Sequence, residues 1–130
     1  QHYRNIAEKF HKADKTVSAH MDGRLNGLLE LVAKAGVDVA DAVTPVPTGD
    51  LTPMEIRKQS GDMILMGGIS PIMWLPVTSE KDFIAHVKEW LELRKINNRL
   101  VLSSGDQVPP GTELKRIKLV FDIVEEYGRY

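Results

Sequence analysis

The segment His20-Met21-Asp22-Gly23 places an imidazole and a carboxylate two residues apart, directly after a short β-prone run. This spacing suits two ligands that point at one atom, and it suits an ordinary strand-to-helix turn equally well. Imidazole and carboxylate groups bind zinc, iron or manganese, and they also serve as general acids and bases. The residues that the fold brings near this segment decide between these uses.

The elements that must position these groups belong to one α/β domain. The chain has 130 residues with 42% hydrophobic and 27% charged residues, which is typical of a single soluble domain, residues 1–130. The net charge of −1 gives no electrostatic footprint for nucleic acid or an acidic membrane. The absence of cysteine excludes disulfides, thiolate ligands and cysteine nucleophiles. With no apolar run of about 18 residues and no signal-peptide pattern, we expect a cytoplasmic protein.

Residues 1–14 predict a leading helix. Tyr3, Ile6, Ala7 and Phe10 recur at helical spacing and form an apolar face that needs a partner. Because the chain begins inside this pattern and without Met, we expect it to be a fragment of a longer protein.

Residues 15–130 predict four strands in alternation with four helices. Strands are expected at 16–20, 37–40, 62–67 and 100–103, and helices at 24–35, 52–59, from a cap at Thr78 or Ser79, and at 112–127. Such alternation is typical of a parallel sheet. We therefore expect a (β/α)4 half of a TIM (β/α)8 barrel, whose usual length of about 250 residues is about twice this chain. The missing N-terminal half or self-association would complete it, and a small open sheet is the alternative.

The carboxyl ends of these strands carry the candidate functional groups. In α/β folds this edge of the sheet is where ligands bind. His20, Asp22 and Asp106 form the candidate metal site, and Asp22 and Asp106 are also the candidate catalytic groups. The expected substrate-binding residues share the same edge: Gly67, Gly68, Ser70 and Ser104.

Each of these residues also has a purely structural interpretation. His20 suits a core histidine bonded to backbone, and Asp22 suits the N-cap of the following helix. Asp106 suits a turn residue that bonds its own backbone, and Gly67-Gly68 suits a tight turn.

Other polar and large apolar residues receive structural assignments. We expect His2, His11 and His86 to face solvent, and the cluster of Lys115, Arg116 and Lys118 to form a solvated helix face. The pairs expected in the core are Met63 with Met66 and Trp74 with Trp90.

Three stretches of the sequence resemble the second half of the uroporphyrinogen decarboxylase superfamily. They are HMDGRLNGLLELVAKAGVD, GDMILMGGISP and RLVLSSGDQVPPGTELKRIKLVFDIVEEYGRY, and the resemblance extends from about Lys15 to Tyr130. The superfamily includes decarboxylases of haem biosynthesis and corrinoid-dependent methyltransferases, all on a (β/α)8 barrel. The resemblance implies that this chain is the last four β/α units of such a barrel.

The sequence departs from both branches of that superfamily. In the methyltransferases the first of these strands typically ends in His-x-Cys-Gly, and a second cysteine follows the fourth strand; here the cysteine positions hold Asp22 and Asp106. The resemblance thus implies a metal site with harder ligands than zinc thiolate. In the decarboxylases an Asp-Gly pair ends the first strand, as Asp22-Gly23 does, but Asp106 replaces a histidine that meets a substrate carboxylate.

Three functions follow as hypotheses. The first is a metal-assisted, corrinoid-dependent methyltransferase acting on a small-molecule substrate, with the corrinoid on a partner protein. The second is a decarboxylase (a carbon–carbon lyase) acting on a tetrapyrrole, and the third is a non-catalytic α/β binding domain. We expect the isolated chain to be inactive, because half of the barrel mouth is absent.

Overall fold

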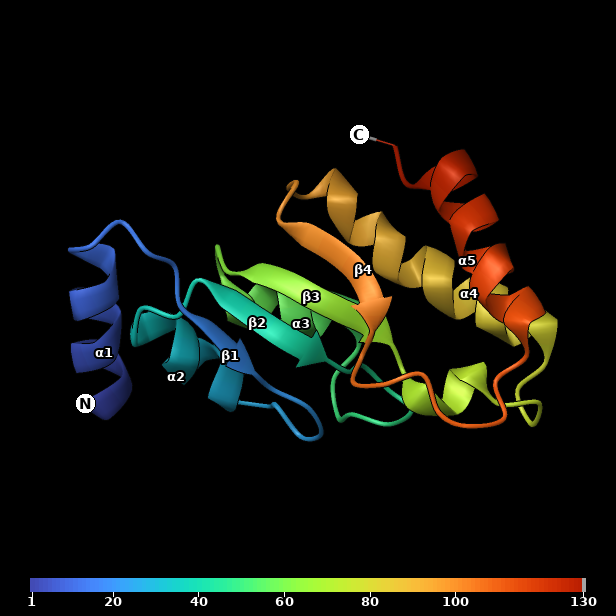
Figure 1. Ribbon diagram of the computed structural model, residues 1–130, viewed down its shortest axis with the longest axis horizontal. Coiled ribbons are helices and arrows are strands. Elements are labelled where there is room, and N and C mark those ends of the chain that lie inside the picture. The colour runs from blue at the N-terminus through green and yellow to red at the C-terminus, as the bar shows by residue number, and fades with distance from the viewer. Residues whose placement is uncertain (130) are drawn as a thin grey trace.

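A computed structural model describes residues 1–129 and shows one four-stranded parallel sheet (Figure 1). Its strands lie in the order β1 (Ser18–His20), β2 (Val39–Val43), β3 (Ile64–Ile69) and β4 (Leu100–Ser104). The helices are α1 (His2–His11), α2 (Leu28–Lys34), α3 (Pro53–Ser60), α4 (Glu80–Leu91) and α5 (Leu114–Tyr127), with 3-10 turns at Pro71–Trp74 (η1) and Glu92–Lys95 (η2). The predicted alternation of strands and helices is confirmed.

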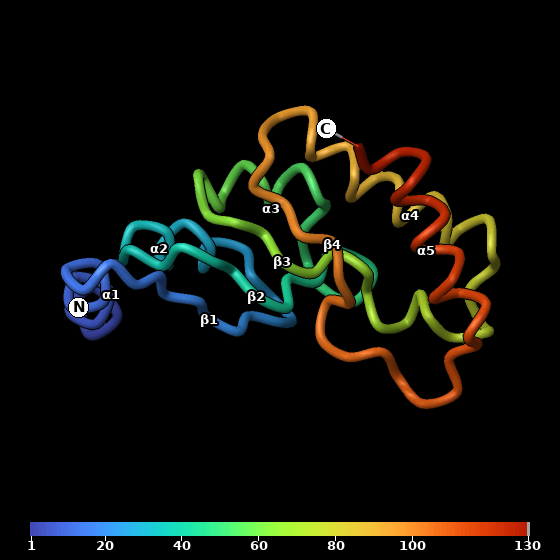
Figure 2. The backbone as a smooth tube through the Cα atoms, turned by 45° about the horizontal axis from the view of Figure 1, so that its top comes forward, coloured from blue at the N-terminus to red at the C-terminus, as the bar shows by residue number. Residues whose placement is uncertain are grey.

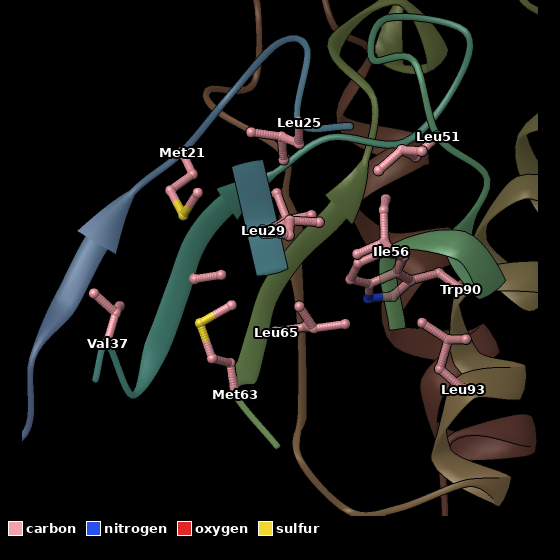
Figure 3. Close-up of a cluster of buried hydrophobic side chains, with 12 residues drawn as sticks. Met21, Leu25, Leu29, Val37, Leu51, Ile56, Met63, Leu65, Trp90 and Leu93 are labelled. Atoms are coloured by element: carbon pink, nitrogen blue, oxygen red, sulfur yellow. The ribbon is translucent and has the colours of Figure 1, made fainter. Parts of the chain in front are cut away.

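Helices α2, α3 and α4 lie on the same side of the sheet (Figure 2). Their buried side chains Leu29, Ile56 and Trp90 pack with Leu65 of the sheet (Figure 3), in a cluster that also includes Ala40. A second cluster joins α4 and α5 to η1. The apolar stripe of α4 is divided between the two clusters: Trp90 belongs to the first, and Phe83, Val87 and Leu91 belong to the second.

The other side of the sheet, which we call the open face, carries side chains that alternate with the buried ones. They are half-buried or exposed: Ser18, His20, Val39, Asp41, Ile64, Met66, Val101 and Ser103. Val101, an apolar residue, is 42% exposed there. In a closed barrel, side chains from further strands would cover such a face.

Side-chain caps begin two of the helices, and the one at Ser79 was predicted. Thr52 and Glu55 form a capping box at α3: the Thr52 backbone N–H donates to Glu55 Oε2 over 2.8 Å, and the Glu55 N–H donates to Thr52 Oγ1. At α4, the Ser79 hydroxyl accepts from the Asp82 N–H over 3.1 Å.

Helix α2 begins four residues later than predicted. Gly27 precedes it in the left-handed region with φ of 75°, and the Leu25 N–H donates to Asp50 Oδ1 over 2.8 Å instead of entering a helix. As a result Leu28 is 44% exposed, whereas Leu25 and Leu29 are buried.

Strand β2 contains a bulge that the sequence did not predict. Ala40 pairs with Leu65 and Val43 pairs with Gly67, so Asp41 and Ala42 together face the single residue between those partners. Ala42 has φ of 61°, a left-handed conformation that is rare outside glycine. The extra residue changes the alternation, and Val43 is fully buried in the helix-covered core.

Two predicted solvent-facing groups are buried. Arg116 is 5% exposed; it donates to the Met73 carbonyl over 2.7 Å and to the Thr78 carbonyl, so it ties α5 to the loop before α4. His86 is 8% exposed, because the loop after β3 covers it. Conversely Phe121, an apolar residue of α5, is 69% exposed.

Candidate active site

His20 is the last residue of β1 and lies on the open face beside Asp41 of β2. The two are direct partners in the parallel register, and His20 Nδ1 is 3.0 Å from Asp41 Oδ2. Their side chains are 59% and 36% exposed. The interpretation of His20 as a buried core residue is therefore wrong.

Asp106 follows β4 and reaches the same imidazole from the opposite edge of the sheet. Its Oδ1 lies 3.8 Å from His20 Nε2, an ion-pair distance that is too long for a hydrogen bond. The sheet thus places one imidazole, whose side chain is 59% exposed, between two carboxylates at its carboxyl edge. Such an arrangement can donate or accept a proton at Nε2.

The predicted three-ligand metal site of His20, Asp22 and Asp106 does not form within this chain. Residues 1–129 contain no group of three His, Asp or Glu side chains that could hold a metal ion. Strand β1 ends at His20, so the two-residue alternation does not extend to Asp22, and His20 Nδ1 is occupied by Asp41. Asp22 is exposed, and it is not the N-cap of α2, because Gly27 takes that position.

His20 and Asp22 do share the wall of a cavity of about 230 Å³ between α1, β1 and α2. Tyr3, Met21 and Leu28 supply apolar surface to it. The cavity lies at the edge of β1 that no strand in residues 1–129 pairs with.

Gly67 and Gly68, predicted to contact substrate, are required by packing. A Cβ on Gly67 would lie 2.7 Å from the backbone nitrogen of Val43, which the β2 bulge brings close. A Cβ on Gly68 would overlap the ring of Trp90, and both glycines have positive φ, of 136° and 102°. These glycines let the sheet accept the bulge on one side and the indole on the other.

The two predicted substrate-binding serines are also occupied by protein groups. Ser70 is fully buried, and its hydroxyl donates to the Pro45 carbonyl over 2.7 Å. Ser104 is half-buried and accepts from Trp74 Nε1 over 3.2 Å. Both serines fix the loops of the carboxyl edge.

His86 contacts the backbone at the end of β3 and in the loop that follows. Its Nε2 lies 2.9 Å from the Gly68 carbonyl oxygen and 3.1 Å from the Ser70 backbone nitrogen. Burial lowers the pKa of His86 below its usual value, and the contact with the Gly68 carbonyl opposes that shift only in part. His86 is therefore a neutral structural group.

Asp41 belongs to this site, although the sequence did not predict it as a metal ligand, a catalytic residue or a substrate-binding residue. Its place at a strand end was visible, but the contact with His20 depends on which strands are neighbours and in what register. Only the sheet order β1-β2 makes this contact evident.

No helix among residues 1–129 is long and apolar enough to span a bilayer. The curated proteins include no sequence that matches this chain. Among solved structures, a methyltransferase from Methanosarcina mazei is similar, with a TM-score of 0.72 and 22% identity. The similarity covers 98% of this chain and 35% of that chain. The fold is therefore a partial TIM barrel, in agreement with the predicted (β/α)4 half-barrel.

A family model for uroporphyrinogen decarboxylase (URO-D) matches residues 1–127, nearly the whole chain. This match agrees with the four parallel β/α units and with the fold of the structural neighbour. The chain belongs to the uroporphyrinogen decarboxylase (URO-D) family.

Proposed function

We propose that this chain supplies half of the mouth of a methyltransferase-like enzyme of the superfamily, in which His20 transfers the proton that accompanies methyl transfer. The observation that carries the proposal is the position of His20 Nε2 on the open face, with Asp41 at 3.0 Å from Nδ1 and Asp106 at 3.8 Å from Nε2. The similarity in fold to a methyltransferase supports the choice of reaction.

Methyl transfer to or from a heteroatom that can be protonated is coupled to a proton at that atom. When a nucleophile takes the methyl as a cation equivalent, the heteroatom keeps the electron pair of the broken bond and becomes a better leaving group if it gains a proton. In the opposite direction, an acceptor loses its proton as the new bond to carbon forms. A positioned acid–base group typically contributes about 100- to 10,000-fold to such a step.

The resemblance to methyltransferases implies a metal ion, but the donors in this chain do not fit one. A metal at His20 Nε2 would have Asp106 as the second ligand and no third ligand among residues 1–129. Further ligands would have to come from outside the chain.

We further propose that four more β/α units complete the mouth, supplied by the rest of a longer protein or by a second copy. The reasons are the open face and the position of β1 and β4 as the two terminal strands of the sheet that residues 1–129 form. The methyl group would pass to or from a corrinoid held by a partner protein, as the resemblance implies, and the isolated chain is expected to be inactive.

A decarboxylase acting on a tetrapyrrole is the second candidate. Asp22 is followed by Gly23 as in that branch, and Asp22 lies beside His20 on one cavity wall. Against it stands Asp106, whose charge would repel a substrate carboxylate near His20.

A direct comparison of the two reactions tests the proposal. The protein with a complete barrel is incubated with a reduced corrinoid and a set of O-, N- and S-methyl donors, and the corrinoid absorbance reports methylation. A parallel assay measures carbon dioxide released from uroporphyrinogen. Corrinoid methylation by at least one donor supports the proposal, whereas carbon dioxide release without methylation replaces it with the decarboxylase.

A further inference from the structure

We propose that Asp41 is a positioning residue that fixes the tautomer and orientation of His20. The inference deepens the proposed function, because it assumes that Nε2 of His20 is the reacting nitrogen. Asp41 contacts Nδ1 of His20, so it acts on Nε2 through the imidazole ring.

The hydrogen bond decides which ring nitrogen carries the proton. An ionised carboxylate only accepts hydrogen bonds, so the 3.0 Å contact requires a proton on Nδ1. In the neutral ring this leaves the lone pair on Nε2, the nitrogen on the side of Asp106. Asp106 cannot impose this choice, since its oxygen lies 3.8 Å from Nε2, beyond hydrogen-bond distance.

The β2 bulge presents Asp41 to His20. Asp41 and Ala42 both face Met66, so the strand bends directly after the carboxylate. Ala42 adopts φ of 61°, and the Thr44 hydroxyl donates to the Ala42 carbonyl over 3.0 Å, which holds the bend.

The surroundings keep the bulge in place. Ala42 and Thr44 are 3% and 2% exposed, and the glycine at position 67 accommodates the displaced Val43 backbone. A strained conformation persists only where its neighbours determine it, and such conformations are concentrated at functional sites. The bulge is thus a second, independent feature that converges on the same carboxylate.

The experiment is a long-range ¹H–¹⁵N NMR correlation of the His20 ring in the 130-residue chain. It is recorded at a pH well above the ordinary imidazole pKa of about 6.5, so that each ring nitrogen appears as protonated or bare. We compare the original chain with Asp41→Ala and with the matched control Asp22→Ala, which removes an exposed carboxylate two residues from His20.

In the original chain the Nδ1–H tautomer is expected to dominate. Asp41→Ala should reduce the ratio of Nδ1–H to Nε2–H at least about fivefold, allowing for the partial exposure of the pair, and Asp22→Ala should leave it unchanged. An unchanged ratio in Asp41→Ala, or an equal change in Asp22→Ala, would overturn the inference. Because this readout does not depend on activity, a shifted tautomer in a protein without methyl transfer would refute the proposed function alone.

Discussion

Replacement of Gly68 by alanine tests whether the glycine pair of β3 serves packing or substrate. Gly68 lies at φ of 102°, and an added Cβ would come closer to the Trp90 ring than the 3.0 Å that real Cβ atoms essentially never pass. Trp90 is fully buried, so the ring has little room to move away. We therefore expect Gly68→Ala to destabilise the chain strongly.

The magnitude follows from two separable costs. A positive φ costs an L residue about 1–2 kcal/mol, and overpacking a core costs about 1–3 kcal/mol, which together give about 2–5 kcal/mol. For a chain of this size, that loss lowers Tm by roughly 6–20 °C. The matched control is Gly27→Ala, at φ of 75° with no atom within 4 Å of the added Cβ, where only the first cost applies.

Thermal and urea unfolding of both variants measure the difference. The Trp90→Leu background provides a second check, because a smaller side chain there should bring the effect of Gly68→Ala close to that of Gly27→Ala. If Gly68→Ala costs no more stability than Gly27→Ala, the assignment of Gly68 to packing against Trp90 is wrong.

Three further predictions concern buried charge, pH and assembly. Arg116→Met should lower the free energy of unfolding by about 2 kcal/mol, because it leaves two backbone carbonyls without donors. Lys115→Met, at the exposed neighbouring position, should change it by less than about 0.5 kcal/mol, and urea unfolding measures both variants. The depressed pKa of His86 means that the unfolded chain binds a proton at this residue more readily than the folded chain does. The free energy of unfolding should therefore be highest above the unfolded pKa of about 6.5 and should fall as the pH drops below it. In measurements of Tm against pH, His86→Gln should flatten this fall, and the exposed control His2→Gln should not. The open face, with β1 and β4 as the terminal strands of the sheet in residues 1–129, should make the isolated chain self-associate at micromolar concentrations. A monomer in sedimentation velocity would contradict this.

Local signals in the sequence were sufficient for much of the fold. The capping box at Thr52 and Glu55 and the cap at Ser79 act within one turn of a helix, so their residue types identify them directly. The apolar stripe of α4 was equally readable, because its helix has one strongly apolar face. The position of His20 at the end of a strand was predicted from the alternation of strands and helices.

Features that depend on distant contacts were not predictable. The late start of α2 depends on the hydrogen bond from the Leu25 N–H to Asp50. Arg116 is buried because carbonyl oxygens in η1 and before α4 accept hydrogen bonds from its guanidinium group. Neither partner can be found from helical periodicity. The same holds for the site: Asp41 replaced Asp22 as the partner of His20 because strand order and register determine the neighbour.

The most direct test of the account is the rate of methyl transfer by His20→Gln in the protein with a complete barrel. The matched control is His11→Gln, which removes another histidine paired with an aspartate, His11 Nε2 lying 2.8 Å from Asp38 Oδ2, at the opposite end of the strands. In single-turnover measurements with a methyl donor that the wild type accepts, the account predicts a fall of about 100-fold or more for His20→Gln and little change for His11→Gln. An equal rate in His20→Gln and wild type would show that His20 does not carry the proton.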